Sequence, residues 1–544
     1  MMRRISGFYR TRFTIILFVT IAVLTSLAWH NRFIQDDAFI SFRYAYNLVH
    51  GKGLVWNEGE RVEGYTNFLW TLAMSIPLYL GYDPVTFSFV LGILFFILTL
   101  VFTYKLSSLI FSSRDIGLLT VILLGTNYTF SSYATGGLET QMQACIFVTA
   151  LYVLLRSLQT NDWKLRTLIP YSFLLSAALL TRLDSALLII VVLPLTVFFI
   201  LKEKIPLTQK MIRVLALFLP FMVLVGGWFI WKFSYYGDIL PNTFYAKAMP
   251  SITSPLRGFC YLYLFLLSYL LIPFPLLFIP ALKRFLNKSN LKMIILTFSI
   301  LLWLLYVVEV GGDFMEFRLI VPILPLLFIL ILWLVFIFIQ QKEIQIALVL
   351  LVLLGSLHHT FAFGKSINPR IMQTIEQLNG YLTYDKWDKI GMVLGRSFHY
   401  DQSVIITVGA AGAIPYYSRL KTIDWFGLSD RWIARYGHFQ GYRPGHQRIP
   451  SLKYLLERKI TLVINPFLKS TVNTSKATYS IHDLRNFFLP RITSQDEIPS
   501  ATKVVEIPID QDCTLVVLYL TRNLVVDEAI QRNNWKVHPI ARDE

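Results

Sequence analysis

The chain has 544 residues, of which 55% are hydrophobic and only 15% are charged, and its mean hydropathy is +0.55. These values exclude an ordinary soluble globular protein and predict a polytopic membrane protein. The formal net charge of +17 does not indicate nucleic-acid binding, because the basic residues fall in short segments between apolar runs and no basic and aromatic stripe accompanies them.

Long apolar runs fill the first two thirds of the chain. From Thr11 to about Phe363 they recur at lengths of about 20 residues, enough for a helix to cross roughly 30 Å of hydrocarbon. The first predicted span is Phe13 to His30, and a first outer loop over 31–84 follows, with one interfacial helix from Thr66. Further spans are predicted to begin near Val85, Gly117, Leu138, Leu168, Ser185, Val214, Phe259, Met293, Leu319 and Ile344, about eleven spans in all.

The chain changes character near residue 364. Runs long enough to span a membrane end there, and charged and turn-forming residues become ordinary. The stretches "SVIITVGAAGAIPYY", "ITLVINPF" and "CTLVVLYL" have strand patterns, and "SLKYLLERK" has a helical pattern. The sequence therefore predicts a transmembrane catalytic domain over 1–363 and a soluble α/β domain over 364–544, with "GAAGA" as a tight strand-to-helix turn.

Basic residues give the predicted membrane domain an orientation. The starting "MMRRISGFYRTR" alone has four arginines, and short basic loops alternate with less basic polar segments along the chain. The first apolar run is interpreted as an anchor, because it is too long for a signal peptide and lacks a clear cleavage site. With the N-terminus in the cytoplasm and an odd number of spans, we expect a multi-pass protein of the cytoplasmic membrane whose active site and C-terminal domain are extracytoplasmic.

Five polar segments interrupt the apolar region, and all fall on the predicted outer side. Ionisable groups at membrane depth are costly and usually serve a site, whereas the inner loops are plain basic linkers. The outer face is therefore where we expect the chemistry. The five segments are "QDDAFISFRYAYNLVHGKGLVWNEGERVEGYTN", "ATGGLET", "TRLDS", "YYGDILPNTFYAKAM" and "GGDFMEFR".

Two adjacent carboxylates, Asp36 and Asp37, open the first of these segments. A helix start explains one of them, because an Asp before "FISFRYAYNLV" caps the helix and interacts favourably with its dipole. That interpretation explains Asp37 and leaves Asp36 without a role. Two close carboxylates push one pKa up, which suits a general base near neutral pH. We predict that both residues are catalytic and leave open which one is the base.

Basic side chains complement these acids on the same face. Arg182 and Arg318 each interrupt an apolar run at its outer end. A guanidinium matches a phosphate bidentately, so basic groups at this boundary predict a phosphorylated lipid whose head group faces outward. Snorkelling side chains, or a local pair between Arg182 and Asp184, are the alternatives. The predicted donor phosphate-binding residues are Arg43, Arg182, Lys247 and Arg318.

Aromatic and amide side chains in the same segments suit a sugar, because rings pack on its C–H faces and amides bond to its hydroxyls. The alternative is an interfacial aromatic belt. In the soluble domain, His446 lies among Arg443 and Arg448 and is either a sugar or phosphate contact or an exposed loop histidine. The predicted substrate-binding residues are Tyr65, Asn67, Glu139, Asn242, Asp313 and His446.

Familiar soluble-enzyme motifs are missing from the sequence. It contains no Walker, GxGxxG or GxSxG motif and no zinc-ligand spacing, so soluble nucleotide-sugar chemistry has no visible site. No metal site and no cofactor are assigned, and a divalent cation is left open.

The order of the motifs resembles that of GT-C fold glycosyltransferases, which use polyprenyl-phosphate sugars. The resemblance is closer to the membrane arabinofuranosyltransferases that add terminal β-1,2-arabinofuranose to actinobacterial arabinan. "VGAAGAIPYYSRLKTIDWFGLSD" and "GYRPGHQRIPSLKYLLERKITLVI" also resemble the C-terminal region of that family, whereas "TRLD" departs from its pattern where a Pro would precede the acid. In the membrane domain the resemblance rests on "DDAFISFRYAYNLVHGKGLVWNEGERVEGYTNFLWT", "GGLET", "TRLD", "YYGDILPNTFYAKA" and "GGDFMEFR".

This resemblance implies an inverting transfer of a sugar, arabinofuranose being favoured, from a polyprenyl-phosphate donor, with a first-loop aspartate as general base. The expected partners are the donor lipid, a glycan or glycoconjugate acceptor of the cell envelope held by the C-terminal domain, and membrane lipids, with no nucleic acid. One alternative is a hexose or aminosugar transferase of the same superfold, acting on lipid A, protein or O-antigen. A transporter of the same lipid is less favoured, because polar groups gather at one face only and no repeat is visible.

Overall fold

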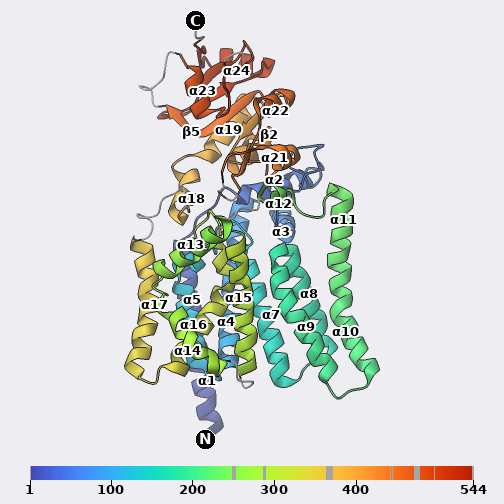
Figure 1. Ribbon diagram of the computed structural model, residues 1–544, viewed down its shortest axis with the longest axis vertical. Helices are drawn as coiled ribbons and strands as arrows, with labels where there is room; N and C mark the ends of the chain where they lie inside the picture. The colour runs from blue at the N-terminus through green and yellow to red at the C-terminus, as the bar shows by residue number, and fades with distance from the viewer. Residues whose placement is uncertain are drawn as a thin grey trace.

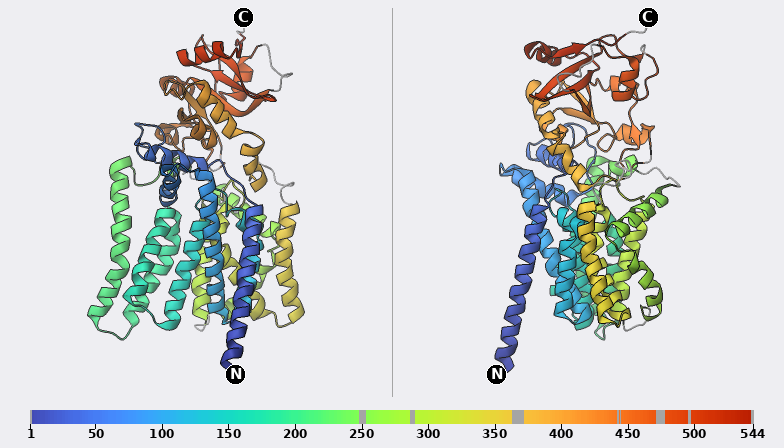
Figure 2. Two further views of the ribbon diagram at one scale, coloured as in Figure 1. Left: turned by 180° about the vertical axis from the view of Figure 1, so that it is seen from behind. Right: turned by 90° about the vertical axis from the view of Figure 1, so that its left-hand side faces the viewer.

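The computed structural model is a layer of long helices with an α/β region stacked on one side of it (Figure 1). It describes residues 2–247, 253–285, 290–362, 372–441, 443, 445–470, 478–494 and 497–541. The N-terminus lies on the side of the helical layer opposite the α/β region, and the two views of Figure 2 show the first helix on the outside of the layer. The chain therefore crosses the layer an odd number of times between its N-terminus and the α/β region.

Each of the eleven predicted spans falls on a helix. By length and composition, 8 helices of the described residues could cross a membrane, or 9 if a pair bent by 106° counts as one span. The other two predicted spans are the shorter helices α5 and α8, of 13 and 17 residues. The helices of the layer are α1 Met2–His30, α4 Pro84–Phe111, α5 Arg114–Thr126, α7 Thr140–Thr160, α8 Leu165–Thr181, α9 Ala186–Lys202, α10 Leu207–Phe221, α11 Gly227–Tyr236, the bent pair α13 Thr253–Ser268 and α14 Pro273–Phe285, α15 Leu291–Glu309, α16 Leu324–Phe338 and α17 Lys342–Ala362.

Burial separates the helices at the centre of the layer from those at its edge. Most side chains of α16 are buried, and this helix contacts α5, α14 and α15. In α10 only Leu217 is buried, and its exposed apolar side chains suit a surface that faces lipid. A π-helical turn over Met222–Gly226 joins α10 to α11 as one span.

Short helices lie on the face of the layer that meets the α/β region. The first loop contains α2 Ala38–Val49 and α3 Phe68–Tyr79, which confirms both helices predicted for it. Asp83 ends this loop, and its carboxylate accepts from the amides of Val85 and Thr86 at the start of α4. Further short elements on this face are α6 Tyr128–Ser132, η1 Leu183–Ser185, α12 Asn242–Lys247 and η4 Arg318–Ile323.

A mixed six-stranded sheet in the order β2-β1-β5-β7-β6-β8 forms the centre of the α/β region. β1 is parallel to β2 and β5, whereas the pairs β5–β7, β6–β7 and β6–β8 are antiparallel. The three predicted strands and the predicted helix are present as β1, β5, β7 and α22. The strands are β1 Ile405–Val408, β2 Lys421–Asp424, β5 Leu462–Ser470, β6 Lys503–Asp510, β7 Cys513–Tyr519 and β8 Lys536–His538, with β3 His438–Phe439 and β4 Arg448–Ile449 as a separate pair.

Seven helices cover this sheet or connect its strands. The turn "GAAGA" joins β1 to a helix, as predicted, and places α20 directly on α2 of the first loop. The helices are α18 Ile375–Thr383, α19 Trp387–Ser397, α20 Ala413–Ser418, α21 Arg431–Tyr436, α22 Leu452–Glu457, α23 Ile481–Phe487 and α24 Leu524–Arg532.

Buried hydrogen bonds fasten the α/β region to the first loop. The indole of Trp56 and the amide of Asn57 both donate to the carbonyl of Thr422, at 3.1 and 2.9 Å. The backbone amide of Thr422 donates in return to Asn57 Oδ1 at 3.1 Å. Because these groups are buried, separating the two parts would leave them unpaired, and so the interface fixes the position of the α/β region.

Candidate active site

Two cavities meet between the helical layer and the α/β region. The larger has a volume of about 940 Å³ and lies mostly among residues of the helical layer. The smaller has a volume of about 400 Å³ and is lined mostly by the α/β region. Asp37, Lys247 and Leu428 line both, so these three residues stand where the cavities join.

The larger cavity collects most of the predicted site residues. They come from five segments that are far apart in the sequence and that the fold brings to one face of the layer. Their positions confirm that the predicted outer-face segments assemble around one space. The predicted residues that line it are Asp37, Tyr65, Asn67, Glu139, Arg182, Lys247, Asp313 and Arg318.

A chain of hydrogen bonds orders one wall of this cavity. Arg182 donates to Glu139 at 2.7 Å and forks onto Asp184 with contacts of 2.7–3.1 Å. The other oxygen of Glu139 accepts from Asn67 Nδ2 at 2.7 Å. The predicted local pair of Arg182 with Asp184 is thus present, and Glu139 extends it to the first loop. Two carboxylates balance this guanidinium and fix its orientation.

Arg318 and Lys247 supply positive charge with fewer partners. Arg318 donates from Nε and Nη2 to the same oxygen of Asp313, both at 2.7 Å. No described residue accepts a hydrogen bond from the ammonium of Lys247 or forms an ion pair with it, although it lines both cavities. Lys247 is exposed at the junction of the cavities, but the surrounding protein still removes enough water to lower its pKa, and the nearby positive charge of Arg318 lowers it further. An anionic ligand would relieve both effects.

Asp37 is the acidic group at the junction. It occupies the N-cap position of α2, yet its side chain makes no capping hydrogen bond, so the capping interpretation does not account for it. Burial raises its pKa, and the positive charges of Arg318 and Lys247 oppose that rise. The carboxylate of Asp37 is partly exposed, and no described residue donates a hydrogen bond to it. It is therefore available to a ligand.

Asp36 makes protein contacts that Asp37 lacks, and its predicted catalytic role stays a prediction. Its two oxygens accept from the backbone amides of Gly412 and Ala413, at 3.0 and 2.8 Å, at the N-terminus of α20. Burial raises its pKa to about 7, although the Ala413 hydrogen bond opposes the rise. Only 7% of Asp36 is exposed, and its carboxylate joins the α/β region to the first loop at the edge of the smaller cavity, which it also lines.

Arg43 and Asn242 also lie outside the larger cavity. Arg43 donates to carbonyls of Trp56, Pro415 and Leu420 and to Asn57, and its guanidinium stacks 4.5 Å from the Trp56 ring. Buried protein acceptors occupy its Nε, Nη1 and Nη2, so the structure places Arg43 at the interface with the α/β region, and its predicted contact with a donor phosphate stays a prediction. Asn242 donates to the carbonyls of Gly427, Leu428 and Asp430, so it holds the α/β region in place instead of reaching a substrate.

The smaller cavity is lined by aromatic rings that the sequence analysis did not single out. Tyr381 and Trp387 stack with ring centres 4.1 Å apart, and Phe467 meets Trp387 nearly edge-on at 5.6 Å. The predicted His446 also lines this cavity, where its ring packs against Phe314 and Phe426. Polar groups are interspersed among these rings, namely Gln373, Gln440, Arg443, Asn465 and Asn486.

One signal in the sequence could have indicated this aromatic wall. The strand β5 contains Pro466, which cannot donate to a sheet ladder, and the register of β5 shifts between Ile464 and Lys469. At this irregularity Asn465 and Phe467 line the cavity. A Pro inside an otherwise regular strand therefore marked the irregularity of β5 that lines the cavity.

The metal expectation remains open. Across the ranges that the structure describes, His, Cys, Asp and Glu side chains do not gather in groups of three or more that could hold an ion. The structure therefore assigns no cation from protein ligands alone.

Sequence comparison connects the chain to two curated relatives, both named terminal β-(1→2)-arabinofuranosyltransferase. The protein from Corynebacterium glutamicum is 26% identical over 334 residues, which cover 56% of this chain and 48% of that protein. The protein from Mycobacterium tuberculosis is 35% identical over 85 residues, 14% of each chain. The matches thus span less than half the length of these relatives. Residues 374–515 also match a family described as a domain of unknown function (DUF8728).

Structural comparison identifies the fold. ArnT from Cupriavidus metallidurans superposes with a TM-score of 0.53 in its apo state and 0.52 in its complex with undecaprenyl phosphate, at 13% sequence identity. Each match covers 94% of this chain and 98% of ArnT. The chain has the GT-C glycosyltransferase fold, as its motif order predicted, with the α/β region as its C-terminal part.

Proposed function

We propose that this protein is an inverting glycosyltransferase that moves arabinofuranose from a polyprenyl-phosphate donor to a cell-envelope glycan or glycoconjugate. The observation that carries the proposal is the position of Asp37, which stands beside Lys247 where a basic cavity and an aromatic cavity join. A base at such a junction can reach one substrate from each side.

The larger cavity is assigned to the donor phosphate. Lys247 and Arg318 each have N–H groups from which no described residue accepts a hydrogen bond. Both line the same cavity as Asp37, and their positive charges lower its pKa. A phosphodiester supplies the anionic oxygens that such groups bind. The complex of ArnT with undecaprenyl phosphate supports a polyprenyl carrier for this fold. Arg182, balanced by two carboxylates, is assigned to ordering the wall.

Asp37 is assigned the role of general base. It accepts the proton of an acceptor hydroxyl as the hydroxyl oxygen attacks the anomeric carbon, and the bond from that carbon to the phosphate oxygen breaks with inversion. The polyprenyl phosphate leaves with the bonding electron pair, and Lys247 and Arg318 stabilise the negative charge that develops on it. The raised pKa of Asp37 makes it a stronger base than an exposed carboxylate.

The smaller cavity is assigned to the acceptor. Its stacked Tyr381 and Trp387 and the exposed ring of Phe467 offer apolar faces for the C–H surfaces of sugars. Amide groups such as Asn465 and Gln440 can bond to hydroxyls from the same wall. His446 takes part on the side nearest the larger cavity, because its neighbour Gln447 lines that cavity. Residues 364–544 are thus proposed to act as the acceptor-binding domain, beside a catalytic domain over 1–363.

The protein is proposed to lie in the cytoplasmic membrane with both cavities on the outer side. The arginine-rich N-terminus and the α/β region lie on opposite sides of the helical layer, and the positive-inside rule places the arginines in the cytoplasm. A reporter that works only outside the cytoplasm, fused after Glu544, should therefore be active. Activity of a cytoplasm-only reporter at the same position would contradict this orientation.

Product analysis with purified protein tests the reaction. The protein is incubated with a synthetic polyprenyl-phosphate arabinofuranose, or with a hexose or aminosugar donor on the same lipid, together with an arabinofuranose oligosaccharide. We expect one pentose to be added from the arabinofuranose donor only, in the inverted configuration. Transfer from the aminosugar or hexose donor alone would assign the site to the alternative class.

A further inference from the structure

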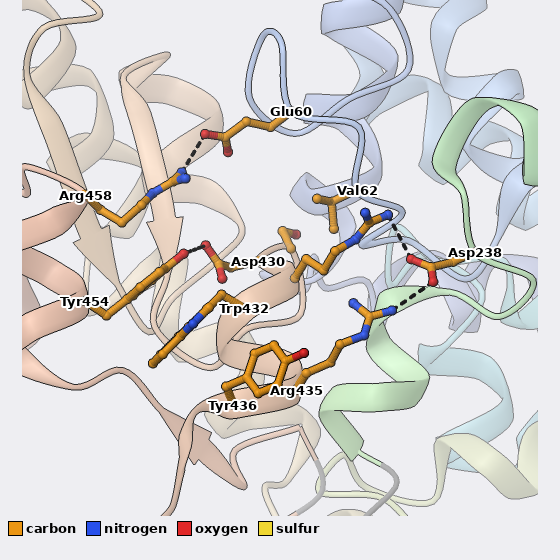
Figure 3. Close-up of a pocket in the computed structure, with 11 residues that line it drawn as sticks. Glu60, Val62, Asp238, Asp430, Trp432, Arg435, Tyr436, Tyr454 and Arg458 are labelled. Carbon is orange, nitrogen blue, oxygen red and sulfur yellow. Dashed lines mark hydrogen bonds and ion pairs between the residues drawn. The ribbon is translucent and has the colours of Figure 1, made fainter.

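A third cavity lies outside the two already described. It has a volume of about 510 Å³ and is formed by the first loop, the segment after α11 and the stretch 429–458 of the α/β region (Figure 3). Aromatic rings line one part of it, and Asp238 with its arginines lies at another. None of these side chains lines the donor or acceptor cavity, so the third cavity is a separate candidate site.

The rings form a preordered platform. Trp432 stacks on Tyr454 with ring centres 4.1 Å apart and planes 7° from parallel. The hydroxyl of Tyr454 donates to Asp430 at 2.8 Å, which fixes that pair. Tyr436 stands one helical turn after Trp432 on α21 and is 68% exposed. Tyr454 covers one face of the indole, so a ligand can contact the other face of Trp432 and the exposed ring of Tyr436, whose centre lies 6.1 Å from that of Trp432.

Charged groups around the platform are paired and balanced. Asp238 accepts from Arg431 at 2.8 Å and from Arg435 at 2.9 Å. Glu60 pairs with Arg458 on the opposite side. Three carboxylates and three guanidiniums line the cavity, so its formal charge is zero and it offers an anion no excess of positive charge. Paired groups of both signs still present free donors and acceptors, as a ligand rich in hydroxyls requires.

The third cavity has no lining residue in common with the substrate cavities, but residues next to one another in the chain line it and them. Leu428 lines the donor and acceptor cavities, while the next residues, Ser429 and Asp430, line the third. On the other side, Asp238 lines the third cavity and Leu240 lines the donor cavity. Because residues one or two positions apart in the chain line the third cavity and the substrate cavities, the third cavity is close enough for a chain of several sugars to reach from the acceptor cavity.

We propose that the third cavity binds an uncharged stretch of a glycan chain, several sugars from the point of transfer. The identification of that chain as the acceptor rests on the proposed function, whereas binding of the glycan does not. Trp432 and Tyr436 pack on sugar rings, and the ordered arginines and carboxylates bond to their hydroxyls. The protein thereby favours long acceptors over short ones.

Two linear arabinofuranose oligosaccharides, a disaccharide and an octasaccharide, test this site on the purified full-length protein. Tyr436→Ala should weaken octasaccharide binding about tenfold, as loss of one well-packed aromatic contact does, and leave disaccharide binding unchanged. Trp432→Ala should act in the same direction. Tyr384→Ala is the matched control, because Tyr384 is 76% exposed, belongs to the same region and lines none of the three cavities.

The two substitutions in α21 are read out by equilibrium binding and by the KM for transfer. A higher KM for the octasaccharide alone, with kcat unchanged, supports a remote glycan site. Equal losses for both oligosaccharides, or no loss in Tyr436→Ala, would overturn it. If the protein binds the octasaccharide in a Tyr436-dependent way but transfers no sugar, the site stands and the proposed reaction fails.

Discussion

Substitution of Gly412 by Ala tests how the α/β region is held over the active site. Gly412 precedes α20, and a Cβ built on it would lie 1.9 Å from the backbone oxygen of Asp36 and 2.6 Å from its carboxyl carbon. An ordinary contact begins near 3.4 Å, so the two segments must separate by about 1.5 Å. The Asp36 backbone cannot swing aside as a flexible side chain would, and α20 must therefore move.

The energetic consequence follows from the two hydrogen bonds that this shift breaks. Asp36 accepts from Gly412 and Ala413 at 3.0 and 2.8 Å, and a further 1.5 Å takes both beyond hydrogen-bond range. Hydrogen bonds to a charged group contribute about 1.5–3 kcal/mol each, so docking loses about 3–6 kcal/mol. The ratio of docked to undocked protein should fall at least about 100-fold, since 1.4 kcal/mol is a factor of ten.

Hydrogen exchange and transfer kinetics measure this effect. In Gly412→Ala, backbone amides at the start of α20 should exchange faster, and kcat/KM for the acceptor should fall. Donor affinity should fall less than acceptor turnover, because Arg318 and most residues that line the larger cavity belong to the helical layer. Gly441→Ala is the control, because its added Cβ meets no atom within 4 Å. Wild-type exchange at α20 together with wild-type turnover in Gly412→Ala would refute the docking role of Asp36.

Four further substitutions distinguish the assigned roles. Arg318→Ala should weaken donor binding about tenfold or more, because a charge-assisted phosphate contact is lost, and unchanged donor affinity would contradict this. Arg43→Ala should leave donor binding intact in the same assay and lower only acceptor turnover. In Lys247→Met, the pH below which kcat/KM falls should be higher, because the lost positive charge lowers the pKa of Asp37 in the wild type. An unchanged profile would show that Lys247 does not act on Asp37. Trp387→Ala should raise the KM for acceptor and not for donor, and the reverse outcome would exchange the two cavities.

Much of the fold could be predicted because its physical signals are local. A run such as that of α16 is apolar throughout and can only be buried or span a membrane, and α10 through α11 is long enough to cross it alone. The strands β2, β3, β4, β6 and β8 were missed. β2 is four residues long and β8 only three, and their places are set by pairing with β1 and β6 instead of by a pattern of their own.

The sequence indicated which segments form the site, but it did not distinguish between the contacts of neighbouring residues such as Asp36 and Asp37. Neighbouring residues of one type give the same signal in the sequence, yet Asp36 accepts from the amides of α20 and lines only the smaller cavity, whereas Asp37 lines both cavities. That difference depends on a helix nearly 380 residues away in the chain. The same holds for Arg43, whose acceptors Pro415 and Leu420 belong to the distant α/β region. Arg318 interrupts an apolar run, and it does line the larger cavity; its signal is visible in the sequence because the cost of a charge in a membrane is local.

Single-turnover transfer by Asp37→Asn tests the central claim most directly. The substitution keeps the shape of the side chain but removes its ability to accept a proton, and general-base catalysis contributes about 10²–10⁴-fold. Purified variant is first loaded with the polyprenyl-phosphate arabinofuranose, and bound donor is measured before an acceptor oligosaccharide is added. We predict donor binding close to that of the wild type and transfer slowed by at least about 100-fold. Transfer at the wild-type rate from the loaded variant would contradict the assignment of Asp37 as the base.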